Sequence, residues 1–368
     1  MNYLDKAKAA IMYALEDNFS NYYKQDQVTK RIKEAKNVCI FGLGEYFNDC
    51  AGHVTSRFDV NLVSDNNPNT WGKTFKGLKC VAPNELIKIE DLVVIIMVGD
   101  YKPIAEQLTG LGVENYPSGD IFLNVFDSHY DNAWFKNNED SIYEALNILS
   151  DDDSKEVFVE VLCNRIAPKL AKKTFNELKI PGEYFNHNIF GFSDNEYFVD
   201  AGAFVGDSIL KFIERVEGRF GEIYSFEMDR FNFERLAEAV KKLNRSDISI
   251  FNIGVWNENK EISYLGEREG SFIDANGSNT AKVGRLDDIL AGKKVTFIKM
   301  DVEGAEIAAI EGASNIIKSQ KPKLAISAYH KLSDLWEVPL LIKELRGDYN
   351  IYLRHHAPVV WDTDCYAY

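Results

Sequence analysis

One segment constrains the fold of this chain more than any other: an acidic residue and two glycines placed between a strand and a helix. Residues 199–208 read Val-Asp-Ala-Gly-Ala-Phe-Val-Gly-Asp-Ser, which has the form D-x-G-x-x-x-G. Gly202 permits a tight strand-to-helix turn, and Gly206 lets the first helical turn lie close to the strand or to a ligand. Asp207 and Ser208 fall where a helix N-cap is expected, beside backbone N–H groups that can hold a carboxylate.

A second acid follows at the distance that nucleotide-binding sheets use for a ribose. Glu227 ends the next predicted strand and follows Gly206 by 21 residues. An acid at this place accepts hydrogen bonds from the ribose hydroxyls. Each feature alone is more often structural, but together they predict an adenosine-type site. Because Asp200 would repel a pyrophosphate and suits a ligand with ammonium and sulfonium groups, the site favours S-adenosylmethionine over NAD.

Strand and helix patterns alternate twice along the chain, which predicts two consecutive parallel α/β units. The expected strands are 38–41, 60–64 and 93–98 in the first unit, and 197–199, 223–226, 248–252, 295–300 and 323–327 in the second, with a less regular final pair at 349–353 and 366–368. The expected domains are an N-terminal helical segment over 1–35, a small Rossmann-like α/β domain over 36–127 that ends near Phe126, a helical connector over 128–195, and a larger α/β domain over 196–368.

Composition excludes several classes of protein. The 42 Lys and Arg stand against 57 Asp and Glu, and no basic tract interrupts this excess, so binding of nucleic acid or of an anionic membrane surface by charge is not expected. The first residues carry charges where a secretory signal has an apolar core, and the longest apolar run, 92–98, is too short to span a membrane. Five scattered cysteines without a CxxC pair fit a reducing compartment. These features predict a cytoplasmic protein.

A third motif brings a resemblance to a known family. Residues 299–306 read Lys-Met-Asp-Val-Glu-Gly-Ala-Glu and follow an apolar strand. Together with segments 198–202, 206–208, 225–227, 328–330, 334–336 and 352–356, they resemble the FkbM family of S-adenosylmethionine-dependent methyltransferases over about residues 155–368. One departure is Met228, where relatives usually have a proline. This change should alter the local turn and leave a ribose contact from Glu227 intact.

The resemblance implies a class I (Rossmann-like) methyltransferase fold, in which the last strands of a seven-stranded sheet form an antiparallel hairpin. It also implies methyl transfer to an oxygen, commonly on a sugar or glycoconjugate, and hence a small-molecule or glycan acceptor. By this resemblance the 200–208 loop would hold the methionine end of the cofactor, Glu227 the ribose, and residues 252–254 the adenine. The cofactor-binding residues expected are Asp200, Gly202, Ala203, Phe204, Gly206, Asp207, Ser208, Glu227, Met228, Asn252, Ile253 and Gly254.

Two residues at predicted strand ends are candidates for the chemistry. Methyl transfer from a sulfonium depends mainly on positioning, and a hydroxyl acceptor also benefits from a general base. Asp301 and His330 follow the 295–300 and 323–327 strands, so both are predicted as catalytic. A helix N-cap at Asp301 and a hydrogen-bonded or surface histidine at His330 are the alternatives. Acids at 301, 303 and 306 resemble a metal-binding set, but the dipole of the following helix explains them more simply, and no metal is predicted.

The first α/β unit carries a weaker signal for ligand binding. Gly42 and Gly44 end its first predicted strand, and Asp65 follows Gly44 by 21 residues. Phe47 stands where the dinucleotide fingerprint needs a third glycine. A turn in a structural domain is therefore the simpler interpretation.

Other functions for this first unit stay open. The turn-rich stretch from Asp65 to Gly77 is similar to the nucleotide-binding start of sugar-modifying enzymes. It is compatible with binding of a nucleotide-sugar, or with docking against a second copy of the chain in a homo-oligomer. Two alternatives for the whole protein are an NAD- or nucleotide-sugar-dependent enzyme centred on residues 36–126, and a non-catalytic binding protein that retains the fold.

Overall fold

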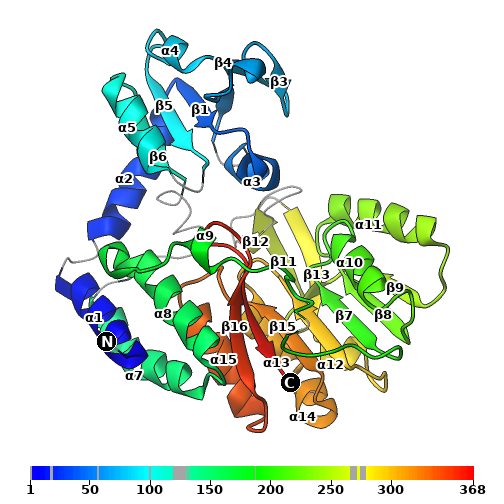
Figure 1. The fold of residues 1–368 in the computed structure, drawn as a ribbon. Coiled ribbons are helices and arrows are strands. Elements are labelled where there is room, and N and C mark those ends of the chain that lie inside the picture. The colour runs from blue at the N-terminus through cyan, green and yellow to red at the C-terminus, as the bar shows by residue number, and fades with distance from the viewer. Residues whose placement is uncertain are drawn as a thin grey trace. The chain divides into compact units, whose positions relative to one another are not determined.

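The chain divides into two compact units, each with its own sheet (Figure 1). The larger unit comprises Met1–Tyr13, His129–Ala357 and Trp361–Tyr368, and the smaller one Ala14–Ser128 and Pro358–Val360. The computed structural model describes residues 2–16, 20–55, 58–98, 101–118, 130, 132–186, 188–265, 272–273 and 279–368. The predicted end of the first unit near Phe126 lies outside these residues.

The smaller unit is built on a six-stranded sheet in the order β3-β4-β2-β1-β5-β6, and only the β3–β4 pair is antiparallel. Its elements are α2 (Ser20–Glu34), β1 (Asn37–Phe41), α3 (Glu45–Thr55), β2 (Val60–Ser64), a 3-10 helix (Pro68–Thr70), β3 (Thr74–Phe75), β4 (Leu78–Val81), α4 (Pro83–Leu86), β5 (Leu92–Ile96), α5 (Lys102–Gly110) and β6 (Glu114–Pro117). Strands β1, β2 and β5 confirm the prediction. Strands β3, β4 and β6 were not predicted because they are short and lack an apolar run.

The larger unit contains a seven-stranded sheet in the order β16-β17-β15-β14-β7-β8-β9. Its strands are β7 (Tyr197–Ala201), β8 (Glu222–Phe226), β9 (Ile248–Phe251), β14 (Phe297–Met300), β15 (Lys323–Ser327), β16 (Ile351–His355) and β17 (Thr363–Ala367). The first five are parallel, while β17 is antiparallel to both β15 and β16, as the family resemblance implied. The final pair begins two or three residues away from the prediction, since buried Arg354 and Asp364 interrupt the apolar pattern.

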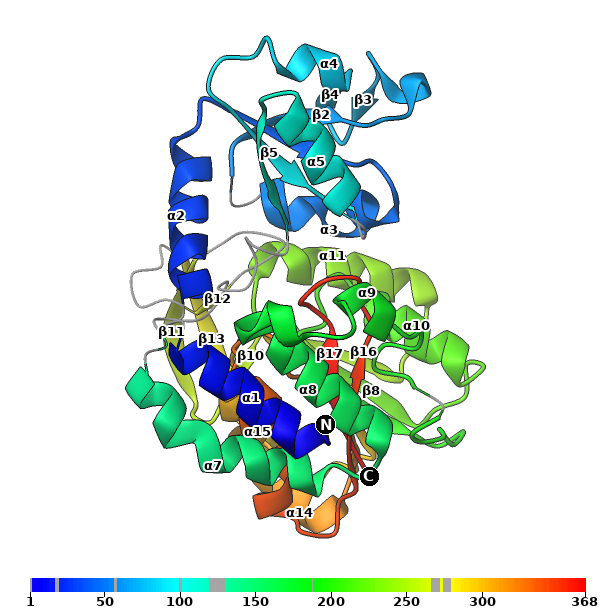
Figure 2. The ribbon, with the colours of Figure 1, turned by 60° about the vertical axis from the view of Figure 1, so that its left-hand side comes forward.

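Helices cover this sheet, and several come from the N-terminal part of the larger unit (Figure 2). Helix α7 packs against α15, α8 packs against β16, and Lys6 of α1 pairs with Glu160 of α8. The helices are α1 (Tyr3–Glu16), α7 (Asn132–Ile148), α8 (Asp152–Ile166), α9 (Phe175–Leu178), α10 (Asp207–Arg215), α11 (Arg230–Leu243), α12 (Leu286–Ile289), α13 (Glu306–Gly312), α14 (Ser314–Gln320) and α15 (Asp334–Leu345), with a 3-10 helix at Pro168–Leu170.

A second, four-stranded sheet in the larger unit was not predicted. It has the order β10-β13-β11-β12 and consists of β10 (Gly254–Val255), β11 (Lys260–Leu265), β12 (Phe272–Ile273) and β13 (Asn279–Gly284). Strands β11 and β13 mix polar with apolar residues, and β10 and β12 are only two residues long, so none has the apolar run that predicts the other strands of this unit.

An aromatic core fixes the segment that precedes β7. Phe198 of β7 stacks on Phe297 of β14 with ring centroids 4.9 Å apart, and Phe212 of α10 joins them. Phe185 and Phe190, which precede β7 in the chain, pack into the same cluster. Burial of large aromatic rings contributes strongly to stability, so this packing holds Phe185 and Phe190 against the sheet.

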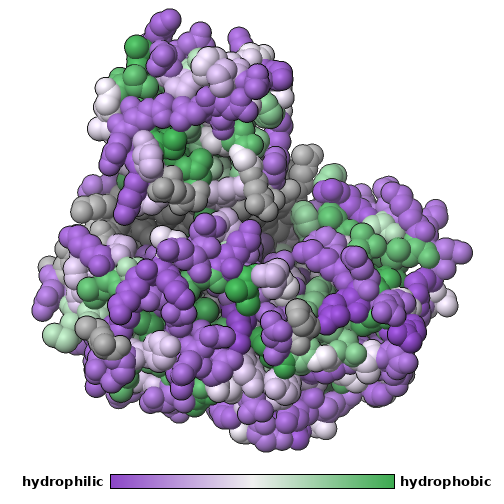
Figure 3. Space-filling view, in the orientation of Figure 1, coloured by the Kyte–Doolittle hydropathy of each residue, from purple (hydrophilic) through white to green (hydrophobic). Residues whose placement is uncertain are grey.

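Hydrophilic side chains cover most of the face drawn in Figure 3. Among the residues that the structure describes, no helix combines the length and the hydrophobicity needed to cross a membrane.

Candidate functional site

The predicted site residues lie where parallel strands of the larger unit end. Strands β7, β8 and β14 are parallel neighbours, so their carboxyl ends meet at one edge of the sheet. Chain order reverses there, because β7 pairs with β8 on one side and with the much later β14 on the other. Open α/β sheets bind ligands at such a reversal.

A buried ion pair joins two of these strand ends. Asp200 of β7 is fully buried, and its Oδ1 lies 3.3 Å from the Nζ of Lys299 of β14. Lys299 also donates to the carbonyl oxygen of Gly202 at 2.7 Å, and its Nζ lies 5.1 Å from the ring centroid of Tyr184. Burial opposes the charge on Lys299, but Asp200 and Asp301 outweigh it and raise the pKa of the ammonium group. Lys299 is therefore charged and holds the loop after β7.

The start of α10 differs in detail from the prediction. Gly206, with φ +93°, is the N-cap, and Asp207 is the first residue of the helix. Ser208 does not cap the helix, because its hydroxyl donates to Oδ2 of Asp200 at 2.6 Å. Both oxygens of Asp200 thus face protein groups, Lys299 and Ser208, so Asp200 holds the loop after β7 in place.

The loop after β7 lies directly on the backbone that follows β14. Gly202 has φ +80°, and a Cβ at this position would stand 1.8 Å from the carbonyl oxygen of Asp301. The backbone N–H groups of Gly202 and Ala203 both donate to the carbonyl oxygen of Phe226, at the end of β8. Only glycine fits at position 202, and three strand ends are therefore in contact through it.

Glu227 also holds the loop after β7, through its side-chain carboxylate. One carboxylate oxygen accepts the N–H of Phe204 and the other accepts the N–H of Asp229, both at 2.8 Å. Burial raises the pKa of Glu227 to about 7, in spite of these two hydrogen bonds. Each carboxylate oxygen can accept a further hydrogen bond, since a carboxylate has about four lone-pair sites.

The residues expected near an adenine lie next to Glu227. The side-chain amide of Asn252 donates to the carbonyl oxygens of Glu227 and Met228 at 2.9 and 3.1 Å. A Cβ at Gly254 would meet the sulfur of Met228 at 3.3 Å, so the Met228 side chain packs closely on this backbone. Ile253 stands between them and is half-buried.

Asp301 lies among two tyrosines and a histidine. The hydroxyls of Tyr184 and Tyr329 donate to its two carboxylate oxygens at 2.8 and 3.3 Å, and the Nε2 of His330 lies 3.4 Å from Oδ1. Burial would raise the pKa of Asp301, but Lys299 and His330 outweigh it and lower the pKa below its ordinary value. Asp301 is therefore an anion in this setting.

His330 lies among three carboxylates. Its Nδ1 is 3.0 Å from Oε1 of Glu306, and its Nε2 is 3.5 Å from Oε2 of Glu303 and 3.4 Å from Oδ1 of Asp301. Burial alone would lower the pKa of His330, but Glu306 and Glu303 outweigh it and raise the pKa to about 10. The imidazole thus holds two protons at neutral pH.

Sequence reasoning missed three residues of this site. Lys299 offered a signal, because a charged residue in an apolar strand calls for a buried partner. Tyr329 lies in the 328–330 segment of the family resemblance, but that resemblance assigns its side chain no role. Tyr184 offered none, since it is 117 residues from Asp301 and reaches it only through the aromatic packing before β7.

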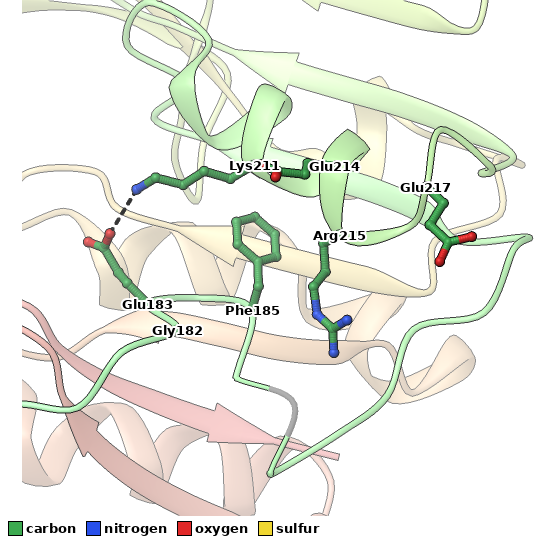
Figure 4. A pocket seen from close by; sticks show the side chains of 7 residues that line it. All are labelled: Gly182, Glu183, Phe185, Lys211, Glu214, Arg215 and Glu217. Atoms are coloured by element: carbon green, nitrogen blue, oxygen red, sulfur yellow. Dashed lines mark hydrogen bonds and ion pairs between the residues drawn. The ribbon is translucent and has the colours of Figure 1, made fainter.

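A surface cavity of about 660 Å³ lies elsewhere on the larger unit (Figure 4). It lies between α10 and the segment before β7, and none of the predicted site residues lines it. Acidic and basic side chains both face it, and Lys211 is paired there with Glu183 at 3.1 Å. Its lining therefore favours neither an anion nor a cation.

In the smaller unit, the glycine turn after β1 is held by Asp65. A Cβ at Gly42, which has φ +108°, would lie 2.5 Å from a methyl group of Val98. The two carboxylate oxygens of Asp65 accept the N–H groups of Leu43 and Asn67 at 2.9 and 2.8 Å. These contacts give Asp65 a structural role in the turn.

Comparison with known proteins identifies two regions of the chain. Residues 200–346 match the family model of the methyltransferase FkbM domain, and residues 34–117 match the C2185-like N-terminal model. The crystal structure of methyltransferase FkbM from Methylobacillus flagellatus KT has a TM-score of 0.68 at 25% identity, and the match covers 100% of this chain and 99% of that one. No curated protein matches the chain.

Two further solved structures are more distant. Aeropyrum pernix fibrillarin, in complex with natively bound S-adenosyl-L-methionine, has a TM-score of 0.32 at 13% identity, covering 48% of this chain and 69% of that one. An rRNA methylase from Streptococcus thermophilus has a TM-score of 0.30 at 14% identity, covering 48% and 86%. Similarity at this level carries no argument about function.

The close approach at Gly202 makes a prediction about stability. We expect Gly202→Ala to lower the free energy of unfolding by at least about 2 kcal/mol, because the added Cβ would collide with a backbone carbonyl at a positive φ. Gly191→Ala is the matched control, since a Cβ there meets nothing within 4 Å. Urea denaturation followed by circular dichroism measures both, and equal stability of the two variants would contradict the contact.

Proposed function

We propose that the protein is an S-adenosylmethionine-dependent O-methyltransferase that acts on a hydroxyl group of a sugar or glycoconjugate, from the premise that residues 200–346 match the methyltransferase FkbM domain. The observation that carries the proposal is the contact of Gly202 with the backbone of Asp301. This contact joins the 200–208 loop, which is predicted to bind the cofactor, to Asp301, which is predicted to act on the acceptor hydroxyl.

The cofactor assignment is supported by the chemistry of the loop. Glu227 is anchored by two backbone N–H groups, so its remaining lone pairs are preorganised for the hydroxyls of a ribose. Asn252 and Met228 lie next to Glu227, and we assign them to the adenine ring. The loop from Asp200 to Ser208 remains for the methionine end, with Asp200 and Ser208 in a positioning role.

We assign the acceptor proton to Asp301. During transfer the bond from the cofactor sulfur to the methyl carbon breaks as the bond from the acceptor oxygen to that carbon forms, and the hydroxyl proton passes to a base. The sequence pointed to His330 as well, but an imidazole that already holds two protons cannot accept another. His330 therefore supports the Asp301 anion, and Tyr184 and Tyr329 orient it.

A first prediction concerns the identity of the cofactor. S-adenosylmethionine or S-adenosylhomocysteine should stabilise the protein by about 2.7 kcal/mol at a hundredfold excess over its Kd, and NAD should do so less. Thermal unfolding measured with each ligand tests this, with Gly42→Val as a control in the smaller unit. Tight NAD binding that Gly42→Val removes, with no effect of S-adenosylmethionine, would reverse the assignment.

A second prediction uses the pKa of Glu227. Because burial raises it to about 7, the carboxyl is largely protonated in mildly acidic solution and accepts ribose hydrogen bonds poorly. The affinity for S-adenosylhomocysteine should therefore rise with pH between about 6 and about 8, by at most about tenfold per unit. Calorimetric titration across this range should show the rise in the wild type and a flat profile in Glu227→Gln.

The control for this experiment is Glu238→Gln, which changes an exposed carboxylate on α11. Glu227→Ala should weaken binding by about 1–3 kcal/mol, since the ribose hydrogen bonds are lost. A pH profile that is the same in wild type and Glu227→Gln would remove Glu227 from the ribose site.

A third prediction separates chemistry from binding. Asp301→Asn should lower turnover by about 10²–10⁴-fold, because the amide cannot accept the hydroxyl proton, and should leave the cofactor Kd nearly unchanged. Release of S-adenosylhomocysteine with a panel of hydroxylated sugars measures turnover, and Glu311→Gln, an exposed position of α13, is the control. Full turnover in Asp301→Asn would end its catalytic assignment.

A further inference from the structure

Tyr184 has an unusual backbone conformation for a residue that contacts the Asp301 carboxylate. Its φ is +57°, a left-handed value that is unfavourable for a residue with a Cβ. Its hydroxyl nevertheless donates to Oδ2 of Asp301 at 2.8 Å. Strained residues persist only where the surrounding structure holds them, and they often occur at functional sites. The groups that hold Tyr184 in place therefore bear on the position of Asp301.

The hairpin of β16 and β17 holds the segment before β7 at two points. His356, which follows β16, directs Nδ1 of its imidazole at the carbonyl oxygen of Ile180, at 2.8 Å. Asp364 of β17 accepts the backbone N–H of Tyr184 on Oδ2, at 3.3 Å. The hydroxyl oxygen of Tyr366 joins these two contacts, because it lies 2.8 Å from Nε2 of His356 and 3.0 Å from Oδ2 of Asp364. His356, Tyr366 and Asp364, here called the hairpin triad, are all buried, and buried networks of this kind stiffen the segments that they join.

The number of protons in the hairpin triad follows from its hydrogen bonds. A carbonyl oxygen only accepts, so the Nδ1 that faces Ile180 carries a proton. The hydroxyl of Tyr366 has one proton and can donate it to only one of its two neighbours. The other contact needs a second proton, which is held either by Nε2 of His356 or by Oδ2 of Asp364. Without that proton, two acceptors would compete for the single proton of Tyr366.

Charge and burial place the second proton on Asp364. Charged side chains from other elements act on both ends of the triad: the carboxylates of Glu183, Asp301 and Asp362 on Asp364, and the cations of Arg354 and Lys211 on His356. A charge at either end would thus lie in the interior beside charges of its own sign. Burial and these neighbours raise the pKa of Asp364 well above its ordinary value and lower the pKa of His356 to about 4.

A second oxygen of Asp364 agrees with a neutral acid. Oδ1 of Asp364 has no hydrogen-bond partner within the part of the chain that the structure describes, and the side chain is fully buried. A buried oxygen without a partner costs less free energy in a neutral carboxyl group than in an anion.

We propose that Asp364 is a neutral carboxylic acid, and that the hairpin triad positions Tyr184 and, through its hydroxyl, the Asp301 carboxylate. Asp364 donates its proton to the oxygen of Tyr366, and Tyr366 donates its own proton to Nε2 of His356. The protonation of the triad stands independently of the proposed function. The positioning role rests on that function, in which Asp301 accepts the proton of the acceptor hydroxyl.

Infrared difference spectroscopy tests the proton on Asp364. The spectrum of the wild type minus that of Asp364→Asn, at neutral pH, should contain the C=O stretching band of a carboxylic acid, and this band should shift in D₂O. Carboxylate bands in its place would overturn the assignment. Nitrogen NMR of the wild type gives a second measurement that does not depend on the folding of Asp364→Asn. Of the six histidines, His356 should be neutral with its proton on Nδ1, and an imidazolium there would also overturn the assignment.

Carbon NMR of the full chain, labelled at Cζ of its tyrosines, tests the link to Tyr184. Tyr184→Phe identifies the signal of this residue. We expect Tyr366→Phe to shift that signal, because the chain of hydrogen bonds that holds Tyr184 is then broken. Tyr352→Phe is the matched control, since it removes from β16 a hydroxyl that lies 3.4 Å from that of Tyr368, outside the triad. A Tyr184 signal that Tyr366→Phe leaves unchanged would overturn the positioning role.

A double-mutant cycle tests the role in turnover. Tyr366→Phe should lower kcat by about three- to tenfold, as expected for the loss of one hydrogen bond, and should leave the Kd of S-adenosylhomocysteine unchanged. In a Tyr184→Phe background the same change should cost less than about twofold, because the hydroxyl through which the triad acts is already absent. An equal loss of kcat in both backgrounds would mean a merely structural effect and would overturn the role. Circular dichroism checks that each variant is folded.

These measurements separate the inference from the proposed function. A wild type that transfers no methyl group to any hydroxylated acceptor would contradict the proposed function, and the infrared and NMR measurements would still decide the state of the triad. An active wild type with full kcat in Tyr366→Phe would overturn the positioning role and leave the assignment of Asp301 intact.

Discussion

The buried ammonium group of Lys299 is the interaction on which the candidate site depends. It pairs with Asp200, donates to the carbonyl oxygen of Gly202 and lies over the ring of Tyr184. A charge in the interior is stable only if it is paired and hydrogen-bonded, and removal of one partner of such a pair usually destabilises a protein strongly. Lys299 therefore connects the loop after β7, the strand β14 and the segment before β7.

This arrangement joins the proposed cofactor half of the site to the proposed acceptor half. Gly202 touches the backbone of Asp301, and the hydroxyl of Tyr184 donates to the Asp301 carboxylate. Tyr184 lies outside the 200–346 region that matches the family model, at a backbone φ of +57°. The hydroxyl that orients the Asp301 carboxylate therefore comes from the segment before β7, outside the matched region. A change in that segment should alter chemistry even though it is remote in sequence.

The sequence predicted the parts of the site that depend on residues close together in the chain. The strand–glycine–helix pattern placed Gly202 correctly in a turn at the end of β7, and the spacing to Glu227 put that acid at the end of the neighbouring β8. The sequence could not predict the environment of His330. Tertiary packing brings three carboxylates around this histidine, and they raise the pKa of its imidazole. The small sheet of β10, β11, β12 and β13 was missed for a different reason, since its strands are very short or mix polar with apolar residues.

The most direct test of this account is a crystal structure of the full chain with S-adenosylhomocysteine. The account predicts that the ribose hydroxyls lie within hydrogen-bond distance of the Glu227 carboxylate, and that the sulfur points toward the side where Asp301 and Tyr184 meet. The loop from Asp200 to Ser208 should keep its contact with Lys299. A ligand bound instead at the glycine turn of the smaller unit, or a ribose away from Glu227, would contradict it.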